Sequence, residues 1–262
     1  MDSKAKTVSL VLGSGGARGL AHIGVIHVLE ERGFEITSIA GSSVGALVGG
    51  IYAAGKLAEY EEWVRHVSKF DMVNLMDIAW VGGGLVKGNK IINKMIKLVG
   101  ERRIEELPIP FTAVATELES GREVWLSEGP LFDAIRSSCS LPLFFTPARY
   151  KEKMLVDGGV VNPVPIAPVF HDNTDLTIAV NLGGRPSKDA LVERKKEIGA
   201  YEVAYFVFDA MQSTIARQKL AAYPPDLVID IPRDSARTFD IDRAAEMIRI
   251  GRKAAEDALD NF

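Results

Sequence analysis

Ser43 stands in a setting that can make a serine hydroxyl nucleophilic. It is the central serine of a G-x-S-x-G pattern at residues 41–45. Residues 38–40 are typical of a strand end, and the apolar run 44–51 is typical of a helix. On such a turn the glycines permit unusual dihedral angles, and the helix N-terminus with the Val44 amide favours a developing oxyanion. The alternative is a glycine-rich helix start that only packs tightly.

A base for this serine must come from elsewhere in the chain, and histidine is the usual one. None of the four histidines follows a strand near the chain end, where an α/β-hydrolase carries its catalytic histidine; they are His22, His27, His66 and His171. Asp157 instead follows the apolar strand 154–156 and precedes two glycines, which suits a carboxylate that faces a cleft. An Asp-Gly pair is also a common turn. Because no Ser-His-Asp triad is found, the sequence predicts a dyad of Ser43 and Asp157.

A glycine-rich loop at residues 13–19 lies between a predicted strand and a predicted helix. Such a loop turns several backbone amides into one concavity, where they can hold a phosphate, a dinucleotide or a tetrahedral oxyanion. In a dinucleotide fingerprint the third glycine would come one residue earlier, although Glu35 lies near the distance expected for its acidic residue. Arg18 can orient the loop or steady an anionic head group. A nucleotide site therefore stays open as an alternative.

These motifs need a scaffold, and the hydrophobic pattern predicts one. Short segments rich in apolar or β-branched residues alternate with helical patterns. The expected strands are residues 8–12, 38–40, 111–116, 154–156, 176–180 and 227–231, and the expected helices are 20–32, 44–54, 58–69, 89–98, 131–138, 193–222 and 241–259. Strands without polar alternation suggest a sheet covered on both faces. We expect an α/β fold, a three-layer α/β/α sandwich with a mostly parallel central sheet.

The chain shows no linker, repeat or low-complexity tract that would divide it. We expect a single domain over residues 1–262, in which the C-terminal helices of residues 193–262 pack on the motif-bearing part, residues 7–182. Residues 71–87 stand apart, because they are apolar without a clear period and contain a triple glycine. We interpret them as a loop that is either a packed connection or an apolar lid over a lipid-binding cleft.

Composition excludes several classes of protein. With 262 residues, 47% of them hydrophobic, the chain can bury a substantial core. A formal net charge of -4 argues against nucleic-acid binding and against strong adhesion to anionic membranes, but it allows a hydrophobic lipid contact. The single cysteine, Cys139, forms no disulfide framework and fits a reducing compartment. The uncharged stretch 36–55 is rich in serine and glycine, so we expect a buried strand, turn and helix there and no transmembrane segment.

With these motifs in place, the sequence resembles the patatin-like phospholipase family. Residues 10–25 resemble that family's glycine-rich oxyanion loop and first helix, residues 41–45 its nucleophile elbow, and residues 157–159 its catalytic aspartate motif. Further similarity runs through residues 115–118, 137–142 and 160–165, so that the resemblance covers about residues 7–182. One departure is Ser14, at a position that is often glycine in the family.

The resemblance implies a serine acyl hydrolase that cleaves lipid acyl esters through an acyl-enzyme on Ser43, with Asp157 as the base. It also implies that the amides of Gly15, Gly16 and Val44 form the oxyanion hole, with Arg18 in support. No metal and no cofactor are expected. Because the aspartate must take the proton directly, partial desolvation should keep its basicity above that of a free carboxylate.

The resemblance also sets expectations about partners and place. We expect a lipid or ester substrate, transient contact with a membrane surface, and a cytoplasmic location that includes the membrane periphery. Two rival classes remain: a nucleotide- or phosphate-binding protein that uses the loop Gly13–Gly19, and a non-catalytic lipid-binding or regulatory protein.

Overall fold

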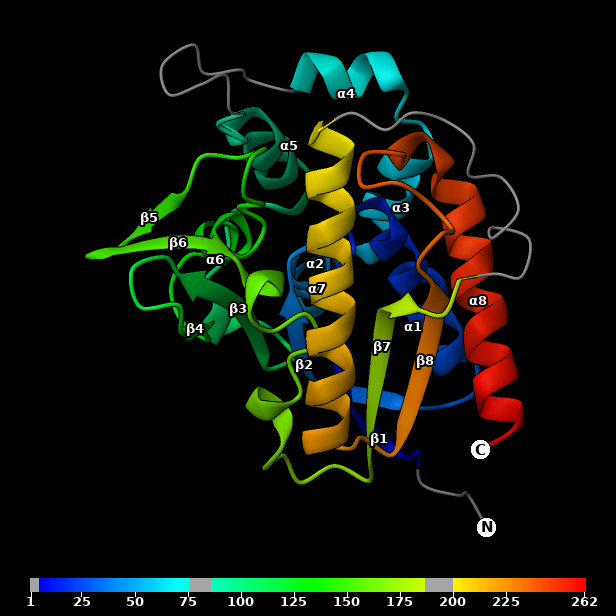
Figure 1. Ribbon diagram of the computed structural model, residues 1–262. Helices are drawn as coiled ribbons and strands as arrows, with labels where there is room; N and C mark the ends of the chain where they lie inside the picture. The colour runs from blue at the N-terminus through cyan, green and yellow to red at the C-terminus, as the bar shows by residue number, and fades with distance from the viewer. Residues whose placement is uncertain (1–4, 76–85, 187–199) are drawn as a thin grey trace.

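The computed structural model describes residues 5–75, 86–186 and 200–262, which build a mixed sheet between helices (Figure 1). The strand order is β5-β6-β3-β2-β1-β7-β8, with β4 paired to β3. The strands are β1 (Thr7–Leu12), β2 (Glu35–Ser42), β3 (Phe111–Glu117), β4 (Glu123–Leu126), β5 (Ala148–Tyr150), β6 (Lys153–Asp157), β7 (Leu176–Gly184) and β8 (Leu227–Pro232). The run β3-β2-β1-β7-β8 is parallel, whereas β4, β5 and β6 pair antiparallel. The predicted α/β fold with a mostly parallel central sheet is confirmed.

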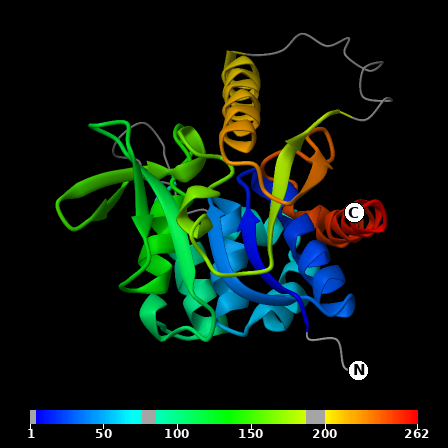
Figure 2. The same ribbon diagram turned by 90° about the horizontal axis from the view of Figure 1, so that it is seen from below.

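Helices cover the sheet on both faces (Figure 2). They are α1 (Ala21–Glu31), α2 (Val44–Ala53), α3 (Leu57–Arg65), α4 (Lys69–Leu75), α5 (Asn89–Val99), α6 (Leu131–Ser138), α7 (Ala200–Ala222) and α8 (Ala244–Asp260). In Figure 1 the long helix α7 lies beside β7, and α8 lies beside α1. Short 3-10 turns at Gly16–Leu20, Ile104–Glu106, Gly158–Val160, Ala167–Val169 and Ile241–Arg243 connect these elements.

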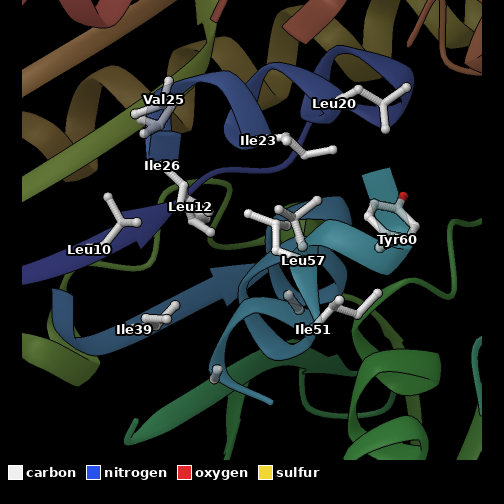
Figure 3. Close-up of a cluster of buried hydrophobic side chains, with 14 of the residues drawn as sticks. Leu10, Leu12, Leu20, Ile23, Val25, Ile26, Ile39, Ile51, Leu57 and Tyr60 are labelled. Carbon is white, nitrogen blue, oxygen red and sulfur yellow. The ribbon is translucent and has the colours of Figure 1, made fainter. Parts of the chain in front are cut away.

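The two faces of the sheet bury separate apolar clusters, because successive strand residues point to opposite sides. Leu10 and Leu12 of β1 belong to the larger cluster, which Figure 3 shows with residues from α1, α2 and α3. Val11, between them, belongs to a second cluster with Ala216 of α7. Since β1 is buried on both faces, its sequence is a nearly continuous apolar run. Both clusters pack against this strand, which leads into the loop at residues 13–19.

Most predicted elements are present with bounds shifted by a few residues, but two strands were missed. β4 has four residues and β5 has three, and both carry charged or exposed side chains such as Glu123 and Arg149. Such short segments carry no periodic signal, and only their pairing with β3 and β6 makes them strands.

Three other predictions have different outcomes: one differs from the structure in part, one can be followed only in part, and one is confirmed. Residues 71–75, predicted as irregular, are the end of α4, whereas residues 76–85 of the predicted lid lie outside the described residues. The predicted helix 193–222 is described only from Ala200. The uncharged stretch 36–55 forms β2 and α2 as predicted, and none of the described helices is long and apolar enough to cross a membrane.

Candidate active site

Ser43 occupies the sharp turn between β2 and α2 that the glycine pattern predicted. Its φ is 55° and its ψ is -125°, a strained backbone conformation for a residue with a side chain. A Cβ on Gly45 would lie 2.0 Å from the carbonyl oxygen of Leu12, so the helix and β1 approach more closely than any other residue would permit. The second glycine of the pattern is therefore required by packing.

The backbone of Ser43 is held on both sides by the end of α6 and the residue after it. The Ser43 amide donates to the Ser138 hydroxyl at 2.9 Å, and this hydroxyl donates to the Val114 carbonyl at 2.6 Å. The Cys139 thiol donates to the Ser43 carbonyl at 3.1 Å. These contacts stabilise the strained turn. The family resemblance covers this segment, but its role could not be predicted from the sequence, because no local pattern connects it to a serine about 95 residues away.

Strand β3 brings the aspartate to the serine. Ser42, at the end of β2, pairs with Val114, and the next residue of β3, Ala115, pairs with Asp157 at the end of β6. The two strand ends therefore meet at consecutive residues of one strand. As a result the Ser43 hydroxyl donates to Asp157 Oδ2 at 2.5 Å.

The Asp157 carboxylate is fully buried and anchored. Its Oδ1 accepts from the Gly159 amide at 2.7 Å, and its backbone carbonyl accepts from the Thr116 hydroxyl at 2.9 Å. Burial disfavours the charged carboxylate and raises the pKa of Asp157 to about 7, although the hydrogen bonds from Ser43 and Gly159 act in the opposite direction. At this pKa the group can both accept and return a proton near neutral pH.

No histidine takes part in this arrangement. His22 is buried, and its Nε2 lies 2.9 Å from the carbonyl oxygen of Gly13, so Nε2 carries the proton and donates. Burial lowers the pKa of His22 to about 4, which keeps the ring neutral. His27 Nε2 lies 3.2 Å from a carboxylate oxygen of Glu61, and His66 Nδ1 lies 2.8 Å from the backbone carbonyl oxygen of Glu62. In the structure, His22 supports the glycine-rich loop.

The glycine-rich loop presents backbone amides beside Ser43. The amides of Gly13, Ser14 and Ala17 donate to backbone carbonyls, namely those of Val180, Pro163 and Thr238. Those of Gly15, Gly16 and Val44 have no acceptor among residues 5–75, 86–186 and 200–262. Gly16 has a φ of 59°, and a Cβ there would lie 2.8 Å from Thr238. The free amides therefore belong to the residues predicted as the oxyanion hole.

The dinucleotide alternative fails on geometry. Its acidic residue should lie at the carboxyl end of the second strand, near the loop. Glu35 is instead the first residue of β2 and pairs with Thr7, the first residue of β1, whereas the loop follows the last residue of β1. The length of the strand separates Glu35 from the loop.

Ser43, Val44 and the loop open on a cavity of about 450 Å³, a volume within the range of small-molecule sites. The rest of its wall is mainly apolar and comes from separate parts of the chain: Leu47, Tyr60, Trp63, Val86, Ile91, Met95, Leu141, Phe144, Phe145, Phe208, Phe239 and Ile241. Arg18, Asp209 and Gln212 add polar groups near the loop. The cavity thus combines a polar end at Ser43 with apolar walls, which suits an acyl chain whose carbonyl group lies at the serine. Among the described residues, no group of histidine, cysteine, aspartate and glutamate could hold a metal ion.

Comparisons with known proteins show the family and the fold of the chain. A sequence model described as patatin-like phospholipase matches residues 10–170. An uncharacterized NTE family protein of Mycobacterium tuberculosis is 36% identical, with 99% of this chain and 93% of that protein covered. Lysophospholipase NTE1 of Coccidioides immitis is 28% identical, and the match covers 98% of this chain but 18% of that protein. The crystal structure of VipD from Legionella pneumophila matches in fold, with a TM-score of 0.59, 14% identity, and coverage of 99% of this chain and 67% of that one.

Proposed function

The chain belongs to the patatin-like phospholipase family, and from this premise we propose that it is a serine acyl hydrolase that cleaves lipid acyl esters through a dyad of Ser43 and Asp157. The family and the relatives named as lysophospholipases support lipid hydrolysis. The observation that carries the dyad is the 2.5 Å hydrogen bond from the Ser43 hydroxyl to a buried carboxylate.

Acylation follows from this contact. Asp157 accepts the Ser43 proton while the serine oxygen attacks the ester carbonyl carbon. The negative charge that forms on the carbonyl oxygen is met by the amides of Gly15, Gly16 and Val44, and by the N-terminal end of α2. Asp157 then gives its proton to the departing alcohol oxygen, which leaves the acyl group on Ser43.

Deacylation repeats the sequence with water. Ionised Asp157 removes a proton from a water molecule, the resulting hydroxide attacks the acyl carbonyl, and the proton returns to Ser43 as the fatty acid leaves. A carboxylate with a raised pKa is the better base for both steps, because its proton affinity lies near neutral pH.

For the substrate we propose a lipid ester with one acyl chain in the cavity, a lysophospholipid being the first candidate. The apolar walls support an acyl chain, and the volume of about 450 Å³ is small for two long chains side by side. Several relatives carry the name lysophospholipase. Because such lipids reside in membranes, we expect transient contact of the protein with a membrane surface.

The test combines active-site labelling with turnover. The unaltered protein, Ser43→Ala and Ser42→Ala are treated with a fluorophosphonate and assayed on lysophospholipid and short ester substrates. We expect labelling and turnover in the unaltered protein and in Ser42→Ala. The Ser42 hydroxyl, next to Ser43 in the sequence, is buried and makes no hydrogen bond with the described residues, so its removal should leave the site intact. Ser43→Ala should lose both. An adduct mapped to another serine would refute the assignment of the nucleophile.

The same experiment separates the rival classes. A protein that only binds nucleotide or phosphate through the loop Gly13–Gly19 would leave Ser43 unlabelled. A non-catalytic lipid-binding protein would bind the lipid without releasing fatty acid.

A further inference from the structure

Arg18 is a buried cation whose hydrogen bonds are made within the protein. Its side chain is 4% exposed, and its guanidinium makes three contacts. Nε donates to the Gly15 carbonyl at 3.0 Å, Nη1 donates to the Arg233 carbonyl at 2.8 Å, and Nη2 donates to Asp209 Oδ1 at 2.7 Å. A planar guanidinium with three fixed partners holds all three in one geometry. Arg18 therefore acts on the loop rather than as a free charge for a ligand.

The contact with Gly15 also fixes an amide. The Gly15 carbonyl and the Gly16 amide belong to one peptide unit, and no peptide in the described residues is cis. In a planar trans peptide the C=O and N–H bonds point in opposite directions. Because Arg18 holds the carbonyl on one side, the Gly16 N–H is aimed at the other. Gly16 has a φ of 59°, a backbone conformation that glycine adopts without strain.

Asp209 of α7 supplies the only carboxylate that the structure places in contact with Arg18 among the described residues. Its side chain is 15% exposed, so the ion pair is largely shielded from water. A buried guanidinium with carbonyl partners alone is costly, and such a group tends to turn toward water when its counter-ion is removed. One helical turn later, Gln212 donates to the Ser14 hydroxyl at 3.2 Å. Helix α7 thus contacts the loop at two points.

We propose that Asp209 is a positioning residue for the oxyanion hole, which acts through Arg18 on the peptide between Gly15 and Gly16. The proposal rests on the proposed acyl hydrolase function and extends it to α7. This helix lies outside residues 10–170, the part that the family model matches. Loss of the carboxylate should free Arg18 to rotate, so that the Gly16 N–H is no longer held toward the carbonyl oxygen of the substrate.

The test compares Asp209→Asn with Asp209→Glu on a short ester, together with a control ion pair. Asp209→Asn should lower kcat about 10- to 100-fold, somewhat less than complete loss of one oxyanion donor. KM should stay within about twofold, and the pH profile should keep its midpoint, because Asp157 is untouched. Asp209→Glu keeps the charge and should restore most of kcat. The control is Glu31→Gln, which breaks the Arg252 pair between α1 and α8 without lining the cavity and should leave kcat unchanged.

Four outcomes would overturn the proposal. A kcat of Asp209→Asn within twofold of the unaltered protein overturns the proposal, and so does a loss that Asp209→Glu shares in full. If Asp209→Asn does not fold, Arg18→Lys replaces it, since an ammonium can pair with Asp209 but cannot hold the Gly15 carbonyl in the same fork. Full kcat in Arg18→Lys overturns the proposal. If the unaltered protein shows neither labelling nor turnover, the proposed function fails, and the role of Asp209 fails with it.

Discussion

Replacement of Asp157 by asparagine should make the protein more stable at alkaline pH while it abolishes turnover. The carboxylate is fully buried, and its pKa is raised from 3.8 to about 7. In the unfolded chain the group ionises near 3.8 and is hydrated. The folded state therefore holds a proton that the unfolded state has already released, and stability falls as the pH rises from about 4 to about 7. Above that window the ionised carboxylate is a standing cost to the fold.

The size of this cost follows from the shift. About three pKa units at 1.36 kcal/mol each correspond to about 4 kcal/mol once both states are ionised. An asparagine of the same shape can accept from the Gly159 amide and donate to the Ser43 hydroxyl, so it keeps both contacts of Asp157 without the charge. The difference in unfolding free energy between Asp157→Asn and the unaltered protein should grow by roughly 2.5 kcal/mol between pH 5 and pH 8.

Urea denaturation of both proteins at several pH values between 5 and 8 measures this difference, and the subtraction removes the effect of every other titrating group. Ser43→Ala is the matched control, because it leaves the carboxylate buried and should keep the pH-dependent cost. Turnover of a short ester should be lost in Asp157→Asn at every pH. A stability difference that does not change with pH would refute the raised pKa, and retained turnover would refute the role of Asp157 as base.

Further expectations concern the pH profile, the elbow and the cavity. The value of kcat/KM should rise with pH through about 7, as Asp157 loses its proton; a controlling step near pH 4 would instead point to His22. Gly45→Ala places a Cβ 2.0 Å from the Leu12 carbonyl oxygen and should lower the unfolding free energy by about 1–3 kcal/mol or more. Thermal or urea unfolding measures this loss, and an unchanged midpoint would contradict the packing argument. Each buried methylene contributes about 0.8 kcal/mol, so kcat/KM should rise from butyryl to octanoyl esters. Phe144 lines the cavity, so Phe144→Ser should flatten that rise. Chain-length profiles that coincide for Phe144→Ser and the unaltered protein would show that the acyl chain lies elsewhere.

Local sequence patterns were sufficient wherever the physics is local. The G-x-S-x-G pattern predicted the turn at Ser43, because a turn of this kind depends on glycines within a few residues. The apolar runs predicted the central strands, since a strand buried on both faces, as β1 is, must be apolar throughout. The short strands β4 and β5 could not be predicted from local patterns, because their conformation depends on pairing with β3 and β6 and not on their own residues.

The contacts that join the motifs were decided only by the tertiary structure. The sequence contained Asp157 and Arg18 as candidates, but not the register of β3 that brings Asp157 to Ser43, nor the turn of α7 that brings Asp209 to Arg18. The Ser138 and Cys139 contacts with the Ser43 backbone are of the same kind. The raised pKa of Asp157 likewise arises from burial by the folded chain around it. Residue type determines what a side chain can do, whereas its proton affinity and its partners depend on desolvation and on segments more than a hundred residues apart, which no local pattern encodes.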